Sequence, residues 1–175
     1  MVLKSTEMKQ KIIIVFLILS SFIAKSQTSN ILTSSDFDAI KINTTSLKDL
    51  KKTKGKQPAV EALLGAVTSY TVDENESYYY FTFKGLKIDF STLGKSKPYV
   101  ESFEVNTNES TFSIKNTTVT IGDDISKLGT VVFSVGRNGS KSILFTVCED
   151  CDSFVNIEFD QTTNIITKIS YMDMS

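Results

Sequence analysis

The sequence predicts an α+β fold in which short helices pack on an antiparallel sheet. Apolar and polar residues alternate over 78–83 and again over 86–90, which is typical of strands with one buried face. A helix-capping pattern begins at Ser46, with Asp49 three residues later. Three further strand-like runs close the chain, at 142–147, 154–159 and 165–171.

Residues 8–27 predict an export signal. Lys9 and Lys11 precede an apolar stretch, 12–24, and small residues at Ala24 and Ser26 match the positions that a signal peptidase reads. An uncleaved membrane anchor is the alternative, but the stretch is shorter than the roughly 20 residues that span a bilayer. We therefore expect an exported protein, periplasmic or extracellular, with no stable membrane insertion after cleavage.

This signal sets the domain organisation that we expect. Residues 1–26 form the signal peptide, and 1–7 precede a second plausible start at Met8, as a start-site artefact would. Residues 27–36 are rich in Ser, Thr and Asn and predict a flexible leader. The rest, 37–175, has the length of a single α+β domain.

The first part of that domain contains a short strand and two short helices. We expect the strand at 37–42. The first helix begins at Ser46 and ends near Gly55, and the second begins at Pro58 and ends at Gly65. One helix and a turn, in place of two helices, is the alternative for these two segments together.

A hairpin follows these helices. Lys84-Gly85 forms its tight turn, and the alternation places Tyr79, Phe81 and Phe83 in the core. Their neighbours Tyr78 and Tyr80 then point to the opposite side of the sheet.

The second part of the domain repeats this order of elements. A strand at 119–121 precedes Gly122, a short helix continues through Leu128, and Gly129 ends it. The negative charges of Asp123 and Asp124 suit a helix N-terminus. The repeated order leaves open a duplication into two tandem helix-plus-sheet units, 37–114 and 115–175.

Segment 118–128 (TVTIGDDISKL) resembles the strand–glycine–helix opening of small exported bacterial domains of the SmpA/BamE and beta-lactamase-inhibitor-protein type. The closing strand, 164–169, is similar to the last strand of that group, whereas 42–50 in the first half lacks the glycine. The group's small lipoproteins carry a cysteine at the cleavage site. Here that position is Gln27, so we expect a soluble protein that is not a lipoprotein. The resemblance implies a protein-binding or assembly role without catalysis.

Composition excludes several classes of function. The chain has no histidine, which removes Ser–His–Asp and Cys–His catalysis and most zinc sites. Removal of 1–26 leaves 15 basic and 19 acidic residues, and Arg137 is the single arginine, so we expect no nucleic-acid partner. The basic run Lys51, Lys52, Lys54 and Lys56 predicts a solvated helix face; contact with a membrane surface or an anionic partner is the alternative.

Cys148 and Cys151 are expected to form a local disulfide, because cysteines this close pair readily in an exported protein. The acidic residues around them oppose the thiolate that redox catalysis needs. Zinc lacks enough ligands here, and calcium lacks regularly spaced oxygens. We expect neither metal nor cofactor. An odd-length loop, 148–152, would pair Phe145 with Val155 and so keep the core residues in phase.

Tyr78 and Tyr80 are the candidate binding residues. Outward tyrosines favour protein interfaces and stacking on sugars or peptides, although they would be structural if another part of the protein covered them. We therefore expect a non-catalytic binding or assembly module that acts on a protein or cell-envelope partner. The alternative is a carboxylate-dependent, glycosidase-like hydrolase, which needs two converging carboxylates but no histidine.

Overall fold

The structure is a computed structural model that describes residues 29–174, so the expected signal peptide, 1–26, lies outside the described residues. Within this range the chain is mostly β, with a nine-stranded sheet, a four-stranded sheet, three short α-helices and one 3₁₀-helix. The expected α+β fold, with helices packed on an antiparallel sheet, is therefore wrong. Helices of five to eight residues are too short to cover so wide a sheet, and strands provide the rest of the cover.

The large sheet contains strands from the whole described chain. Its strands are β1 (Asn30–Ile31), β4 (Ser69–Val72), β5 (Tyr78–Phe83), β6 (Leu86–Ser91), β7 (Tyr99–Val105), β10 (Ser134–Val135), β11 (Lys141–Thr146), β12 (Ser153–Phe159) and β13 (Ile166–Asp173). They run in the order β1-β11-β12-β13-β7-β6-β5-β4, and β10 also pairs with β11. Only the β1–β11 pair is parallel among these strands. The two proposed halves, 37–114 and 115–175, meet in this one sheet where β7 pairs with β13.

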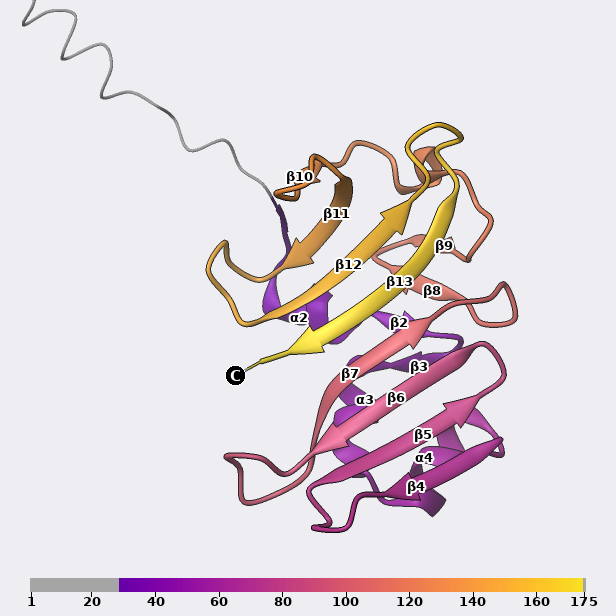
Figure 1. The fold of residues 1–175 in the computed structure, drawn as a ribbon, viewed down its shortest axis with the longest axis vertical. Helices are drawn as coiled ribbons and strands as arrows, with labels where there is room; N and C mark the ends of the chain where they lie inside the picture. The colour runs from indigo at the N-terminus through magenta and orange to yellow at the C-terminus, as the bar shows by residue number, and fades with distance from the viewer. Residues whose placement is uncertain (1–28, 175) are drawn as a thin grey trace, which may run out of the picture.

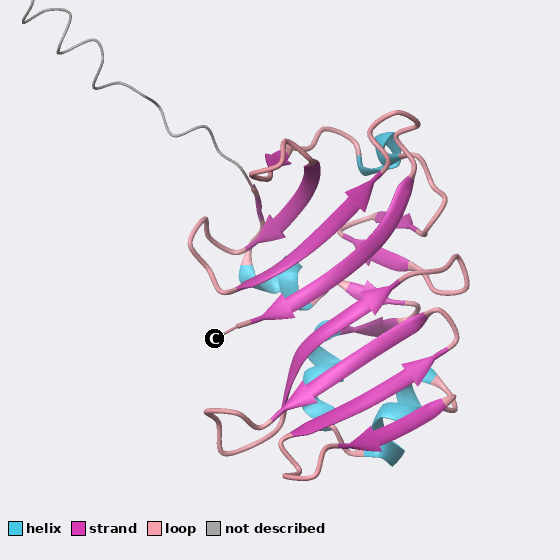
Figure 2. Cartoon of the chain, viewed as in Figure 1, coloured by secondary structure: helices cyan, strands magenta, loops and turns pink. Residues whose placement is uncertain are grey.

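A second layer covers one face of the large sheet. It consists of the small sheet, ordered β3-β2-β8-β9, and the helices. The bounds are β2 (Lys41–Ile42), β3 (Thr45–Ser46), β8 (Phe112–Ile114), β9 (Thr117–Val119), α2 (Ser34–Asp38), α3 (Leu47–Thr53), α4 (Gln57–Leu64) and the 3₁₀-helix η1 (Ile125–Leu128). In Figures 1 and 2 this layer lies behind the strands of the large sheet, whose other face is turned to the viewer.

The core lies between the two layers. The ring of Phe103 on β7 stacks on that of Tyr171 on β13, with centroids 5.3 Å apart, and lies 6.4 Å from Phe112 on the small sheet. Phe37 of α2 lies 6.1 Å from Tyr171. These rings connect strands and a helix that are far apart in the sequence, so one core serves both halves of the chain.

The predicted hairpin is confirmed. Phe83 pairs with Leu86 across the turn, and Phe81 pairs with Ile88, so the two apolar sets share one face. Gly85 has φ of +72°, a conformation that the tight turn requires and that glycine adopts without a steric penalty. Phe81 is 1% exposed, while Tyr79 packs at the margin of the core.

The two expected helices after Ser46 are confirmed as α3 and α4. The Ser46 hydroxyl accepts a hydrogen bond of 3.0 Å from the Asp49 N–H, which satisfies one free donor at the start of α3. Pro58 lies in the first turn of α4, and the N–H of Gly65 donates to Glu61 at its end.

The start of the domain differs from expectation. The leader proposed for 27–36 includes Asn30–Ile31, which forms β1 beside β11, and Leu32 is buried. The strand proposed for 37–42 is limited to Lys41–Ile42, because Thr33 caps the short helix α2 just before it. The Thr33 hydroxyl accepts from the Asp36 N–H at 3.1 Å, a local bond that favours helix over strand.

The second expected cycle is confirmed in outline. The strand predicted at 119–121 ends at Val119, and the helix after Gly122 is the 3₁₀-helix η1, capped by Asp124 and ended by Gly129. The three closing strands form the predicted meander, β11-β12-β13. Phe145 pairs with Val155 and Ile143 with Ile157, so the register predicted from the odd-length loop is confirmed.

Candidate functional site

The outer face of the large sheet carries the two tyrosines proposed from the sequence. We call this the open face, meaning the face turned away from α2–α4 and the small sheet (Figure 2). On β5 it presents Tyr78 and Tyr80, because these residues alternate with the buried Phe81 and Phe83. Tyr80 is 39% exposed. Their binding role stays a prediction, but neither residue belongs to the core.

Tyr78 and Tyr80 form a stacked pair. Their ring centroids are 6.0 Å apart and the ring planes differ by 11°. Stacking fixes two large side chains on the surface, so little side-chain freedom remains to be lost when a partner binds. Tyr99 on β7 lies on the same face, since it pairs with Ser91, which in turn pairs with Tyr78.

Two carboxylates lie beside these rings. Asp89 pairs with Tyr80 across β5 and β6, and the Ser102 hydroxyl donates to its carboxylate at 2.9 Å. Burial raises the pKa of Asp89 above its usual value, although Ser102 and Lys87 act in the opposite direction. Burial also raises the pKa of Glu101, and the negative charges of Asp89 and Asp173 add to that shift. We call Tyr78, Tyr80, Tyr99, Asp89 and Glu101 the tyrosine patch.

A β-bulge gives the tyrosine patch its shape. The register between β6 and β7 shifts between Asp89 and Phe90, so Asp89 faces Ser102 while Phe90 faces Val100. Glu101 is the additional residue on β7, and such a residue re-aims side chains at a sheet surface. The bulge therefore lets the consecutive residues Glu101 and Ser102 both lie on the open face beside Asp89, which strict alternation would not allow.

The strands β7 and β13 form a cavity of about 540 Å³ next to the patch. Glu101 and Asp173 contribute carboxylates to its lining, and Tyr99 contributes a ring. Its apolar lining is strongly exposed: Leu93 at 50%, Met172 at 41% and Met174 at 61%. The open face therefore combines apolar side chains, aromatic rings and negative charge.

Farther along the same face the charges are balanced. Lys168 on β13 lies 2.8 Å from the Glu104 carboxylate, and this pairing lowers the pKa of Glu104 below its usual value. Asp89 and Glu101 form no such ion pair with another residue of 29–174, and burial is the main cause of their raised pKa values. The unbalanced carboxylates are thus those next to Tyr78 and Tyr80.

The tyrosine patch already accommodates one cation. The Lys95 ammonium lies 3.7 Å from the centroid of the Tyr99 ring. Such cation–π contacts contribute about 0.5–1 kcal/mol at exposed sites. The rings on this face are therefore open to a positively charged group.

The cysteines form the predicted disulfide between Cys148 and Cys151. It closes the loop between β11 and β12, where the Thr146 hydroxyl lies 3.0 Å from the carbonyl oxygens of both Cys148 and Ser153. Within residues 29–174 no three His, Cys, Asp or Glu side chains gather as a metal ion would require.

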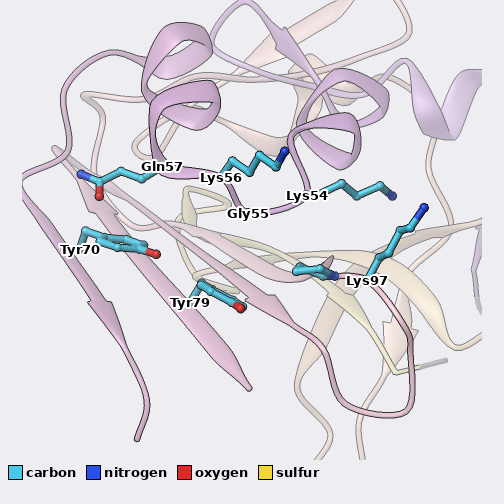
Figure 3. Close-up of a pocket in the computed structure, with 8 residues that line it drawn as sticks. Lys54, Gly55, Lys56, Gln57, Tyr70, Tyr79 and Lys97 are labelled. Atoms are coloured by element: carbon cyan, nitrogen blue, oxygen red, sulfur yellow. The ribbon is translucent and has the colours of Figure 1, made fainter. Parts of the chain in front are cut away.

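A second cavity, of about 610 Å³, lies on the covered side of the sheet (Figure 3). The loop between α3 and α4 forms one wall with Lys54, Lys56 and Gln57, and Tyr70 and Tyr79 form the opposite wall. Gly55, Lys97 and Pro98 complete the lining. We call it the lysine cavity.

Sequence reasoning found Tyr78 and Tyr80 but missed their neighbours. Tyr99, Glu101 and Met172 reach this face only through the pairings of β7 with β6 and β13. These pairings are non-local, so no spacing of residues along the sequence predicts them. The alternation on β6 does place Asp89 on the side opposite the core, so the position of this one carboxylate was predictable from the sequence.

No protein-family model and no curated protein matches the chain. Two solved structures are weakly similar. One is a cysteine-rich secretory protein from Staphylococcus aureus, with 13% identity, a TM-score of 0.39, and coverage of 67% of this chain and 43% of that chain. The other is an extracellular protein containing an SCP domain from Bacillus anthracis, with 13% identity, a TM-score of 0.42, and coverage of 87% and 50%. This chain spans half of their length or less.

These comparisons correct the resemblance drawn from residues 118–128 and 164–169. Membership of the SmpA/BamE and beta-lactamase-inhibitor-protein group is wrong, because the similar structures are a cysteine-rich secretory protein and an SCP-domain protein. A strand–glycine–helix opening is a short local motif that a mostly β fold also contains. None of the helices among residues 29–174 is long and apolar enough to cross a membrane.

Proposed function

We propose that this chain is an exported, non-catalytic module that binds a protein partner through the tyrosine patch of its open face. The stacked, part-exposed pair Tyr78 and Tyr80 beside the unbalanced carboxylates Asp89 and Glu101 carries the proposal. Tyrosines are enriched among the residues that dominate binding energy at interfaces. The Cys148–Cys151 disulfide accords with an exported protein.

The charge of the patch defines the chemistry of the partner. Asp89 and Glu101 hold negative charge against burial and against each other, so a basic side chain placed between them would relieve an existing repulsion. The same side chain would lie against the tyrosine rings, as Lys95 lies over Tyr99. The partner therefore presents Lys or Arg within an apolar surface that packs on Leu93 and Met172.

A capture experiment with a matched control tests this function. The exported form of the chain serves as bait for proteins of the envelope and culture fractions, in wild-type form and as Tyr80→Ala and Phe133→Ala. Tyr80 and Phe133 are equally exposed, at 39% and 40%, but Phe133 contacts Phe159 away from the patch. Tyr80→Ala should lower the affinity for the captured partner about tenfold or more.

The Phe133→Ala control distinguishes an effect at the tyrosine patch from the general loss of an exposed aromatic ring. Phe133→Ala should bind as the wild type does, and both variants should stay folded, with melting temperatures within about 4 °C of the wild type. Equal loss of binding in both variants, or full binding by Tyr80→Ala, would show that the partner binds elsewhere. A captured lipid or glycan in place of a protein would also contradict the proposed class of partner.

One observation favours a carboxylate-dependent hydrolase as a second candidate. Glu101 and Asp173 line the same cavity, and burial raises the pKa of Glu101 as it does for a general acid. This function predicts turnover of a polysaccharide that both Glu101→Gln and Asp173→Asn abolish. Release of reducing ends from a panel of soluble polysaccharides measures it, and no release by the wild type would contradict it.

A further inference from the structure

The lysine cavity is the basis of an inference that does not depend on the proposed role of the open face. It lies on the covered side of the large sheet, between the α3–α4 loop and the strands β4 and β5 (Figure 3). Its volume of about 610 Å³ falls within the range of small-molecule sites, roughly 300–1,000 Å³. A few polar groups converge on it from two sides, as they do in such sites.

The basic run that preceded Pro58 in the sequence divides in the structure. Lys51 lies 3.1 Å from Asp38, and Lys52 lies 2.7 Å from Asp49, so both are paired on the helix surface. Lys54 and Lys56 instead line the cavity, and neither forms an ion pair with another described residue. Lys51 and Lys52 therefore lie on a helix as expected, whereas Lys54 and Lys56 are exposed in the loop that follows it.

A third lysine approaches from the other side. Lys97, in the loop between β6 and β7, extends toward the end of Lys54 in Figure 3 and likewise forms no ion pair among residues 29–174. In Figure 3 the ammonium ends of Lys54 and Lys97 lie near each other, whereas that of Lys56 points back toward the helices. Two like charges repel each other, and an anion between Lys54 and Lys97 would convert that repulsion into attraction. Lysine is a common phosphate binder that acts as a point charge.

Backbone geometry holds the loop in this place. Lys54 and Gly55 both have left-handed backbones, with φ of +54° and +66°. A Cβ on Gly55 would lie 3.2 Å from two side-chain atoms of Phe90, so only glycine lets the loop lie so close to β6. Lys56 then starts α4 without a side-chain cap, which leaves the positive end of that helix near the cavity.

Two tyrosines form an apolar wall with polar tips. The Tyr70 ring packs on Phe81, with centroids 4.8 Å apart, and Tyr79 packs at the margin of the core. Figure 3 shows both hydroxyl groups directed along the gap below the lysine loop. The rings are thus fixed, and they offer a flat apolar surface with two hydroxyl donors to a ligand.

We propose that the lysine cavity binds a small organic phosphate. The phosphate group lies between Lys54 and Lys97, and a ring-shaped apolar body lies against Tyr70 and Tyr79. A dianion suits two lysines better than a single carboxylate does, and the tyrosine wall gives a ring-bearing phosphate an advantage over the bare ion.

Calorimetric titration of the full exported chain with phenyl phosphate, inorganic phosphate and phenol tests the assignment. Phenyl phosphate should bind more tightly than either fragment, and its affinity should fall as the salt concentration rises. The double substitution Lys54→Gln/Lys97→Gln should weaken phenyl phosphate binding about tenfold. The control Lys48→Gln/Lys115→Gln removes the same charge at two exposed lysines outside the cavity and should change binding less than twofold.

Each contrary result overturns a stated part of the proposal. The site is wrong if the wild type binds no phenyl phosphate, or if both double variants weaken it equally. The ligand class is wrong if inorganic phosphate binds as tightly as phenyl phosphate, because the tyrosine wall would then contribute nothing. All four lysines are exposed, so the variants keep the fold, and their melting temperatures verify this.

Discussion

The two faces of strands β5 and β6 differ sharply, although their residues alternate one by one along the same chain. Phe81 and Ile88 point to the covered side and are at most 1% exposed, while their neighbours Tyr80 and Asp89 point to the open face. Among residues 29–174, the buried polar side chains are all Ser or Thr, so the core holds no charge. In the function that we propose, one strand supplies stability with one set of side chains and recognition with the other.

The electrostatics of the open face reinforce this division. Glu104 is paired with Lys168, whereas Asp89 and Glu101 carry raised pKa values beside the tyrosines. A surface selected only for stability would balance these charges. Burial makes the charged forms of Asp89 and Glu101 slightly destabilising, and a basic partner of the kind that we propose would offset that cost.

The largest effect that we expect separates the two faces by stability. Phe81→Ala should lower the free energy of unfolding by about 3–5 kcal/mol, because it removes a buried ring that packs against Tyr70 and Phe90. Tyr80→Ala should lower it by about 1 kcal/mol or less. Denaturant unfolding of both variants measures the difference. If Tyr80→Ala is as damaging as Phe81→Ala, both faces of β5 are buried in the folded protein.

A smaller effect tests the balanced end of the open face. The Lys168 ammonium lowers the pKa of Glu104, so this pair stabilises the fold above the unfolded-state pKa, and the gain is lost as pH falls through the folded-state pKa. Glu104→Gln should therefore lower the free energy of unfolding at pH 7 by about 0.2–1 kcal/mol, and lower the melting temperature accordingly. The gap from the wild type should close near pH 3. A gap that persists at that pH would assign the effect to packing.

The smallest effect has the opposite sign. Burial raises the pKa of Asp89 in the fold, so its contribution to stability is present below the unfolded-state pKa, about 4, and is lost as pH rises through the folded-state pKa. Asp89→Asn should therefore raise the melting temperature at pH 7 and have little effect near pH 3. The amide oxygen still accepts the hydrogen bond from Ser102. A lowered melting temperature at pH 7 would show that the charge is already balanced.

Local patterns predicted the parts of the fold that local chemistry determines. The β5–β6 hairpin follows from alternation and the turn at Gly85, and the pairing of Phe145 with Val155 follows from an odd-length loop. Strands of two or three residues, such as Asn30–Ile31 and Phe112–Ile114, are too short to show a period. They form because a neighbouring strand is present, so local sequence patterns could not predict the second layer or the fold class.

The candidate sites were likewise predictable only where a local sequence pattern determines them. Tyr78 and Tyr80 were predicted because alternation alone places them opposite the core. Glu101 and Asp173 come together only through the β7–β13 pairing and the bulge on β7. The division of the basic run depends on how closely Gly55 approaches Phe90, a contact between residues 35 positions apart in the chain.

The most direct test of the central claim, that the open face binds the partner, uses the six tyrosines as reporters. Tyr78, Tyr80 and Tyr99 lie in the tyrosine patch, Tyr70 and Tyr79 line the lysine cavity, and Tyr171 is buried. NMR spectra of the tyrosine-ring-labelled protein are recorded as the captured partner is added. We predict that the signals of the three patch tyrosines shift or broaden while those of the other three stay unchanged. Perturbation of Tyr70 and Tyr79 with the patch signals unchanged would contradict the account.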